Sequence, residues 1–251
     1  MPNPPVSAAS RAPWRFRPRA LPTLAMLVAV VVCAAAGRWQ QGRMQEKEML
    51  RAQMDAALRM APVALASLPG ATEWTALRYR PVVADGVYRG QAQILIDNKV
   101  HHGRAGYHVV APLELPDGRA VLVNRGWVAQ GASRAALPDV PAPGGSVTVE
   151  GRVAVPPAGY LELEAEAAGT VWQNLDPPRF ASATGIAVLP VVIEQTAAPT
   201  PDDGLVRAWP APDFGVDKHR IYMVQWYAFA TLAIVLWLVL NVHRPSPPDH
   251  D

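Results

Sequence analysis

The residue with the clearest potential for chemistry is His219, which begins a helical series of ring side chains. Tyr222 and Trp226 follow it at i+3 and i+7, a spacing that places the three residues along one face of a helix. A neutral imidazole can ligate iron, and aromatic rings can cover a flat metalloporphyrin. Tyr and Trp also gather at bilayer surfaces through solvation alone. The residues by themselves therefore leave two interpretations open, a cofactor ligand and an interfacial belt.

His219 lies at the edge of a long apolar segment. Residues 221–242 carry no charged side chain, and this length matches the ~20 apolar residues that cross a bilayer as a helix. A second uncharged segment covers residues 20–37. We therefore expect two transmembrane helices, with residues 38–220 between them forming a domain on one side of the membrane.

The first apolar segment has features that suit contact with the second. Small residues recur at every fourth position and predict a face that another helix can approach closely. Trp39 and Arg43 follow this segment, so they should lie at the same membrane face as His219 and could complete a pocket with it. The small residues are Ala25, Ala29, Cys33 and Gly37.

The charge pattern predicts the orientation. Residues 1–19 contain no acidic residue, and their arginines favour a cytoplasmic N-terminus, a cytoplasmic tail at 243–251 and an extracytoplasmic domain at 38–220. A cleaved secretory signal and a mitochondrial targeting segment are alternatives for the N-terminal region, but its length and composition favour an anchor in a bacterial inner membrane. The arginines are Arg11, Arg15, Arg17 and Arg19.

The segment between the two apolar runs predicts an α+β domain. Residues 38–61 are rich in helix formers and predict a helical stem, residues 78–195 are rich in β-branched residues, and residues 199–215 form a linker dense in Pro, Gly and Asp. We expect a mainly antiparallel sheet or a partly closed barrel. The predicted strands are 80–88, 91–96, 107–115, 120–128, 146–153 and 188–194.

Local signals mark the ends of several elements. Pro116-Asp117-Gly118 predicts a hairpin turn, and Asp97-Asn98 predicts a break between strands. A short helix should begin after Asp176, which can cap it, and end at Gly185.

Arg125 and Trp127 are a second candidate for function. In a regular strand they share one face, so the guanidinium could stack on the indole, bind an anion or contact a partner. A buried strand that needs Gly126 for a close backbone approach explains the same residues without any ligand.

Other classes of function find little support. The net charge of +2 and the apolar fraction of 50% argue against nucleic-acid binding, and no motif of an enzyme active site is present. Copper remains an alternative cargo, although sulfurs spaced by five or six residues on a helix do not share a face. The candidate copper ligands are Met44, Met49, Met54, Met60, His101, His102 and His108.

Three separated patches resemble the Surfeit locus protein 1 family. They occur in the family's order and together cover nearly the whole chain. The first follows the N-terminal apolar segment, the second lies in the predicted sheet, and the third begins the C-terminal apolar segment. They are Gly37-Arg38-Trp39-Gln40 with Arg43 and Lys47; Arg80-Pro81-Val82 with Gly86, Gly106-Tyr107, Pro112 and residues 122–127; and His219 with Tyr222, Gln225 and Trp226.

This resemblance implies a protein that assists the assembly of haem-copper cytochrome oxidases and is not an enzyme. It implies transient binding of haem a, with His219 as the axial ligand of the iron and Tyr222, Trp226, Trp39 and Arg43 around the macrocycle. The implied partners are haem a synthase, cytochrome oxidase subunit I and membrane lipid. A scaffold that binds only proteins, and a copper-delivery factor, are the alternatives.

Overall fold

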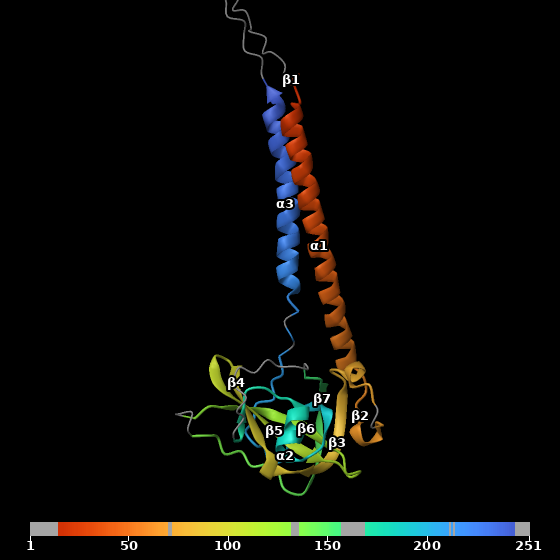
Figure 1. Cartoon of the computed structure of the whole chain (residues 1–251), viewed down its shortest axis with the longest axis vertical. Coiled ribbons are helices and arrows are strands. Elements are labelled where there is room, and N and C mark those ends of the chain that lie inside the picture. The colour runs from red at the N-terminus through yellow and green to blue at the C-terminus, as the bar shows by residue number, and fades with distance from the viewer. Residues whose placement is uncertain are drawn as a thin grey trace, which may run out of the picture. The chain divides into compact units, whose positions relative to one another are not determined.

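The chain divides into two compact units, which are described separately. One contains residues 1–51 and 213–251, and the other contains residues 52–212. Figure 1 shows the helices of the first unit and the strands of the second. The computed structural model describes residues 15–69, 72–131, 136–156, 169–210, 212 and 214–243.

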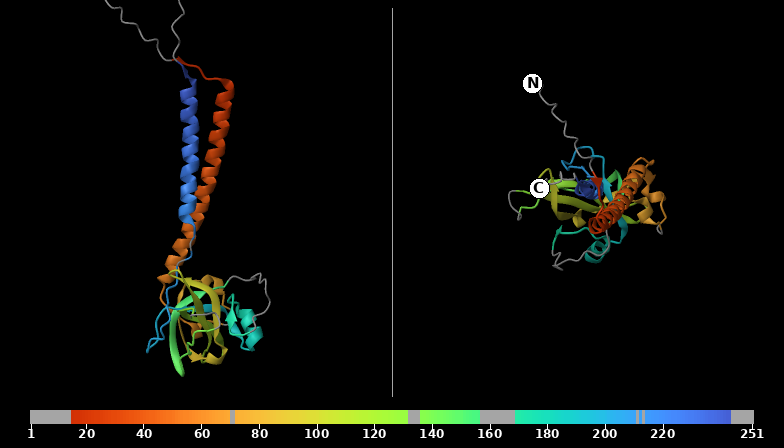
Figure 2. Two further views of the ribbon diagram at one scale, coloured as in Figure 1. Left: turned by 90° about the vertical axis from the view of Figure 1, so that its left-hand side faces the viewer. Right: turned by 90° about the horizontal axis from the view of Figure 1, so that it is seen from above.

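The first unit is a pair of long apolar helices. Helix α1 covers Ala20–Leu58 and continues into the second unit, whereas α3 covers Val216–Asn241. The two helices run side by side in Figure 1 and in the left view of Figure 2. Each is long and apolar enough to cross a membrane, and only 11% and 6% of their most apolar windows are buried. This exposure favours contact with lipid, because the core helix of a soluble protein would be mostly covered.

The residues through which each helix contacts the other are spaced alternately by three and by four positions along the chain. Such a period of 3.5 residues keeps one face of each helix against the other, as in a left-handed coiled coil. On α1 the less exposed positions include Met26, Val30, Cys33, Gly37, Gln40 and Met44. On α3, beyond the first residue, they are His219, Met223, Trp226, Ala230, Ala233, Trp237 and Asn241.

Gly37 marks a close approach of the two helices. A Cβ atom at this position would lie 3.0 Å from two ring carbons of Tyr227. Ala29 and Cys33 share this contact side with Gly37, but Ala25 is exposed. The predicted face is therefore only partly correct, because a repeat of four residues drifts away from a contact that repeats every 3.5 residues.

The other end of the helix pair is closed by polar contacts. Strands β1 (Arg15–Phe16) and β10 (Val242–His243) pair antiparallel there. The indole nitrogen of Trp237 donates to Thr23 Oγ1 at 2.9 Å, and the backbone nitrogen of Arg19 donates to Asn241 Oδ1 at 3.0 Å. The side chain of Asn241 is buried, and its carbonyl oxygen has a hydrogen-bond donor there.

The second unit contains an eight-stranded mixed sheet, counted over the residues that the structure describes, in the order β2-β3-β7-β9-β6-β5-β4-β8. Most neighbours are antiparallel, so the predicted α+β class is confirmed. The strands are β2 Val63–Ala64, β3 Pro81–Tyr88, β4 Ile94–His101, β5 Arg104–Glu114, β6 Ala120–Ala129, β7 Ser146–Ala154, β8 Val171–Trp172 and β9 Val188–Gln195. Short 3-10 helices cover Leu65–Ser67, Trp74–Leu77 and Gly90–Ala92.

A second pairing closes part of this sheet into a barrel. Strand β3 also pairs with β5, through Val87 with Glu114 and Tyr88 with Leu113. Strands β3, β7, β9, β6 and β5 therefore form a closed ring. The larger core fills the face that these strands share, and it includes Val82, Leu113, Val121, Val149 and Ile193.

The alternate side chains of the same strands form a second core on the outer face. Leu122 and Val192 pack there with Phe180 of α2 (Pro177–Thr184). The predicted ends of this helix are confirmed, because the Asp176 side chain accepts from the backbone nitrogen of Arg179 and Gly185 adopts the left-handed conformation that ends a helix.

The turns match the sequence in one place and differ in another. The hairpin at residues 116–118 joins β5 and β6 as predicted, with Gly118 at φ +84°. The predicted break at Asp97-Asn98 is wrong, because β4 continues through it. Asn98 adopts φ +59° and the register with β5 shifts between Ile96 and Lys99, so this site is a bulge within the strand.

Candidate functional site

The site begins with the interaction between His219 and Gln40. His219 lies in the first turn of α3, and its Nδ1 atom is 2.7 Å from Oε1 of Gln40 on α1. A carbonyl oxygen only accepts hydrogen bonds, so Nδ1 carries the hydrogen and donates it. The neutral ring then keeps its lone pair on Nε2.

This arrangement suits a metal-ligating histidine. Such a residue usually donates its second ring N–H to a carbonyl or carboxylate, which fixes the tautomer and the ring orientation. Gln40 is only 9% exposed, so its amide is held within the contact between the helices. Nε2 of His219 has no hydrogen-bond partner among the described residues. The donor chemistry of this pair therefore fits a haem iron.

The other predicted ring residues differ in their surroundings. Trp226 is half-buried on the same side of α3 as His219 and packs edge-on against Phe229 at 6.0 Å. Tyr222 and Trp39 are 52% and 62% exposed, so both rings face away from the tight contact between the helices. The structure therefore brings His219 and Trp226 onto one face and leaves Tyr222 beside it.

Charged side chains surround the His219 end of the helix pair. Arg43 forms an ion pair with Glu46 at 2.6 Å, so it is engaged within its own helix. Arg220 lies 3.4 Å from Glu48 and 3.5 Å from Asp217, and all three are exposed. Exposed pairs at such distances are weak, so these arginines can exchange their partner for another anion.

Arg125 has a structural role in the barrel domain. It is completely buried in β6 and donates to Asp203 Oδ2 at 3.0 Å and to Gln93 Oε1 at 2.8 Å. Its guanidinium also lies over the ring of Tyr88 at 5.6 Å. Burial raises the pKa of Tyr88 to about 12, so this ring stays neutral. Arg125 is thus surrounded by partners from its own domain.

Trp127 does not stack on Arg125, contrary to the sequence-based interpretation. Val109 pairs with Gly126 and Val110 pairs with Asn124, so Arg125 is an extra residue in β6. One extra residue reverses the alternation of side chains along a strand. Trp127 consequently lies on the face of Asn124, where its indole nitrogen donates to the carbonyl of Lys99 at 3.0 Å.

The predicted copper ligands do not form a common site. The rings of His101 and His102 contact each other at 4.3 Å, but His108 is bonded to Asn124 instead. Within the described residues, no group of three or more His, Cys, Asp or Glu side chains could hold a metal ion. Met54 is buried, whereas Met49 is exposed, so the methionines of α1 do not share a face either.

Gln40 is a functional candidate whose role the sequence did not predict. Its partner is 179 positions away in the chain, so no local pattern connects the two residues. A signal was nevertheless present. Gln40 belongs to Gly37-Arg38-Trp39-Gln40, the first patch of the family resemblance, whereas the predicted repeat of four residues pointed to Gln41 as the next contact position.

Comparisons with known proteins identify relatives of this chain. A SURF1-like protein of Monosiga brevicollis is 29% identical over 86% of this chain and 86% of its own length, and one of Drosophila melanogaster is 29% identical over 83% and 73%. One of Rickettsia felis is 27% identical over 41% and 45%. The model of the SURF1 family, whose members are assembly factors and not enzymes, matches residues 27–231. Because this match runs from within α1, through the barrel domain, to within α3 and so covers most of the chain, the chain belongs to the SURF1 family.

Proposed function

We propose that this protein is a membrane-anchored assembly factor for a haem-copper cytochrome oxidase. It binds haem a transiently through His219 and supports delivery of the haem to oxidase subunit I. The observation that carries this proposal is the hydrogen bond from His219 to Gln40, which leaves Nε2 free to act as a ligand. Membership of the SURF1 family supports the role in oxidase assembly.

The side chains near His219 would contact different parts of the haem. Trp226 and Tyr222 would cover the macrocycle, and Trp39 would extend this apolar wall from α1. Arg43, which is exposed and only locally paired, would bind a propionate by exchanging Glu46 for it. The imidazole of His219 would hold the iron of the haem, which is the group that this protein would carry.

The membrane arrangement belongs to the same proposal. The charge of residues 1–19 supports a cytoplasmic N-terminus, which places residues 38–220 in the periplasm and residues 243–251 in the cytoplasm of a bacterium. Residues 20–37 and 221–242 would be the transmembrane segments in the inner membrane. Haem a synthase would then supply the haem from the same bilayer, and subunit I would receive it there.

Visible spectroscopy tests the proposal. The full-length protein is produced in a membrane that makes haem a, purified in detergent and measured alongside His219→Ala. We expect wild-type protein to carry haem and His219→Ala to be colourless. His101→Ala is the matched control, because it removes a histidine that contacts only rings outside the helix pair, and it should retain the haem.

Two results would contradict the haem proposal in different ways. A colourless wild-type protein that still co-purifies with oxidase subunit I would favour a scaffold that binds only proteins. A His219→Ala protein that keeps its colour would show that another residue ligates the iron.

A further inference from the structure

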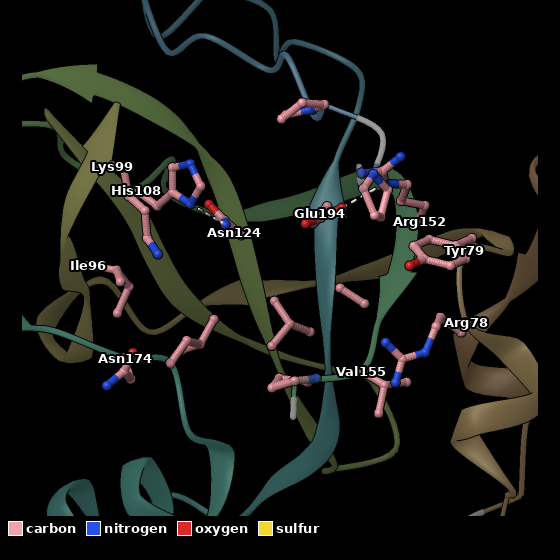
Figure 3. A pocket seen from close by; sticks show the side chains of 16 residues that line it. Arg78, Tyr79, Ile96, Lys99, His108, Asn124, Arg152, Val155, Asn174 and Glu194 are labelled. Carbon is pink, nitrogen blue, oxygen red and sulfur yellow. Dashed lines mark hydrogen bonds and ion pairs between the residues drawn. The ribbon is translucent and has the colours of Figure 1, made fainter. Parts of the chain in front are cut away.

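A cavity of about 330 Å³ lies on the outer face of the barrel domain. Residues of β4, β5, β6, β7 and β9 line it. Figure 3 shows polar side chains at two sides of this cavity, with Lys99, His108 and Asn124 at one and Arg78 and Arg152 at the other. This volume is in the range of small-molecule sites.

The first side contains a buried acceptor without a donor. Asn124 is 6% exposed, and its Nδ2 atom donates to Nδ1 of His108 at 3.1 Å. Its Oδ1 atom has no hydrogen-bond partner among the described residues. A buried carbonyl without a donor is costly, so this atom predicts a ligand that brings an N–H or O–H group.

The same side also presents donors and a positive charge. Because Nδ1 of His108 accepts from Asn124, the neutral ring carries its hydrogen on Nε2 and can donate it. Lys99 lines the cavity next to His108, and burial lowers the pKa of its amine. Burial therefore penalises the ammonium group, and a bound anion would offset that penalty.

The lining of the cavity carries more positive than negative side chains, and its floor is apolar. Its lining includes the cations Arg78, Lys99 and Arg152 but the single carboxylate of Glu194, which pairs with Arg152 at 2.6 Å. Arg78 has no side-chain partner in the described part of the chain. The apolar contribution comes from Ile96, Leu175 and Val192.

We infer that this cavity binds an α-amido carboxylate, which is the chemistry of an acylated amino acid or of the free C-terminal residue of a peptide. The carboxylate is held by Lys99 and the Nε2–H group of His108. The adjacent amide N–H donates to Oδ1 of Asn124, and the side chain rests on the apolar floor. A simple anion would satisfy the cations but not the unpaired acceptor.

The test uses a set of matched ligands with the full-length protein in nanodiscs. Saturation-transfer NMR compares N-acetyl-leucine with N-acetyl-leucinamide, which lacks the charge, and with N-acetyl-N-methyl-leucine, which lacks the N–H group. We expect N-acetyl-leucine to bind and each analogue to bind at least tenfold more weakly. No binding of N-acetyl-leucine, or equal binding of all three, would overturn the inference.

Variants locate the binding in this cavity. Lys99→Met keeps the aliphatic stem and removes the charge, and we expect at least a tenfold loss of affinity for N-acetyl-leucine. Arg104→Met removes a cation from the exposed first residue of β5, outside the lining, and should bind as wild type does. Equal loss in both variants would show nonspecific charge attraction and would refute the assignment.

A further binding experiment identifies the source of the ligand. An acetylated tetrapeptide that ends in leucine is compared with N-acetyl-leucine. Tighter binding of the tetrapeptide supports the site and assigns it to the C-terminus of a partner protein, whereas binding of N-acetyl-leucine alone supports the site and assigns it to a small acid. Binding of neither contradicts the proposal.

Discussion

At the scale of single residues, the proposed iron ligation depends on the hydrogen bond from His219 to Gln40, which sets the tautomer of the imidazole. A histidine has two nitrogens, and the one that can bind iron is decided by the hydrogen bond of the other. Gln40 Oε1 accepts from Nδ1, so Nε2 is the nitrogen with a lone pair. The aromatic spacing around His219 was visible in the sequence, but the partner that sets its tautomer was not.

Replacing Gln40 should weaken haem binding without abolishing it. In Gln40→Ala the ring keeps its ligand atom but loses the group that orients it, so we expect roughly a 10–100-fold loss of haem affinity. The measurement is a haem titration of the purified protein, followed by visible absorption. Gln41→Ala is the control, because Gln41 is the exposed neighbour on the same helix. Equal affinity in both variants would show that Gln40 does not orient the ligand.

His108 should make the barrel domain sensitive to acid. Burial and then the charge of Lys99 lower its pKa from 6.5 to about 4, so the unfolded chain binds a proton more readily than the folded domain. Stability is therefore fully present above pH 6.5 and decreases as the pH falls toward 4, by up to about 3 kcal/mol.

Thermal unfolding at several pH values checks this expectation in detergent. His108→Gln should flatten the dependence between pH 6.5 and 4, whereas His102→Gln, in the exposed hairpin turn, should leave it unchanged. The same slope in wild type and His108→Gln would contradict the assignment of this proton to His108.

At the scale of elements, the sequence predicted the caps and turns that depend on neighbouring residues. The cap at Asp176, the left-handed Gly185 and the hairpin turn at Gly118 each depend on a few neighbouring residues. The bulges at Asn98 and Arg125 depend on how a strand pairs with a neighbour far away in the sequence, so strand patterning did not reveal them. The contact between α1 and α3, which repeats every 3.5 residues, also depends on a distant partner, so the sequence of one helix did not predict it.

The packing of α1 on α3 should be sensitive at Gly37. In Gly37→Ala the new methyl group meets the Tyr227 ring at 3.0 Å, which forces the ring or the helix to move. We expect about 1 kcal/mol of destabilisation of the helix pair, measured by thermal unfolding in detergent. Gly42→Ala is the matched control, since its methyl group meets nothing within 4 Å and should stabilise the helix slightly. Tyr227→Ala should remove the penalty at Gly37. Destabilisation of equal size at Gly37 and Gly42 would argue against this contact.

The barrel domain should depend strongly on Arg125. This side chain joins β6 to the segment around Asp203. Its replacement by Met removes the donor to Gln93 Oε1 and one of the two arginines at Asp203, which keeps its pair with Arg207. We expect Arg125→Met to cost about 1–3 kcal/mol in chemical denaturation, because it removes buried hydrogen bonds. Arg89→Met, which breaks an exposed pair with Glu114, should cost less than about 1 kcal/mol. An equally small effect of both substitutions would contradict a structural role for Arg125 and would show that Arg207 alone holds Asp203 in place.

At the scale of the whole molecule, the proposed topology requires both apolar segments to cross the bilayer. Cys33 is the only cysteine, so a Cys33→Ser background allows single reporter cysteines to be placed elsewhere. Val100→Cys, in the exposed β4–β5 hairpin, should react with a membrane-impermeant maleimide in intact bacterial spheroplasts. Ser246→Cys, in the predicted cytoplasmic tail, should react only after permeabilisation. The reverse pattern would invert the orientation.

If the imidazole of His219 ligates the iron of haem a, free imidazole should replace it in a variant that lacks the ring. His219→Gly removes the ring while leaving space for free imidazole, and the purified variant is titrated with haem a in the presence and absence of imidazole. We predict that haem is retained on the protein only when imidazole is present, with a visible spectrum close to that of wild type. Retention of haem by His219→Gly without imidazole, or a failure of imidazole to restore it, would contradict ligation of the iron by His219.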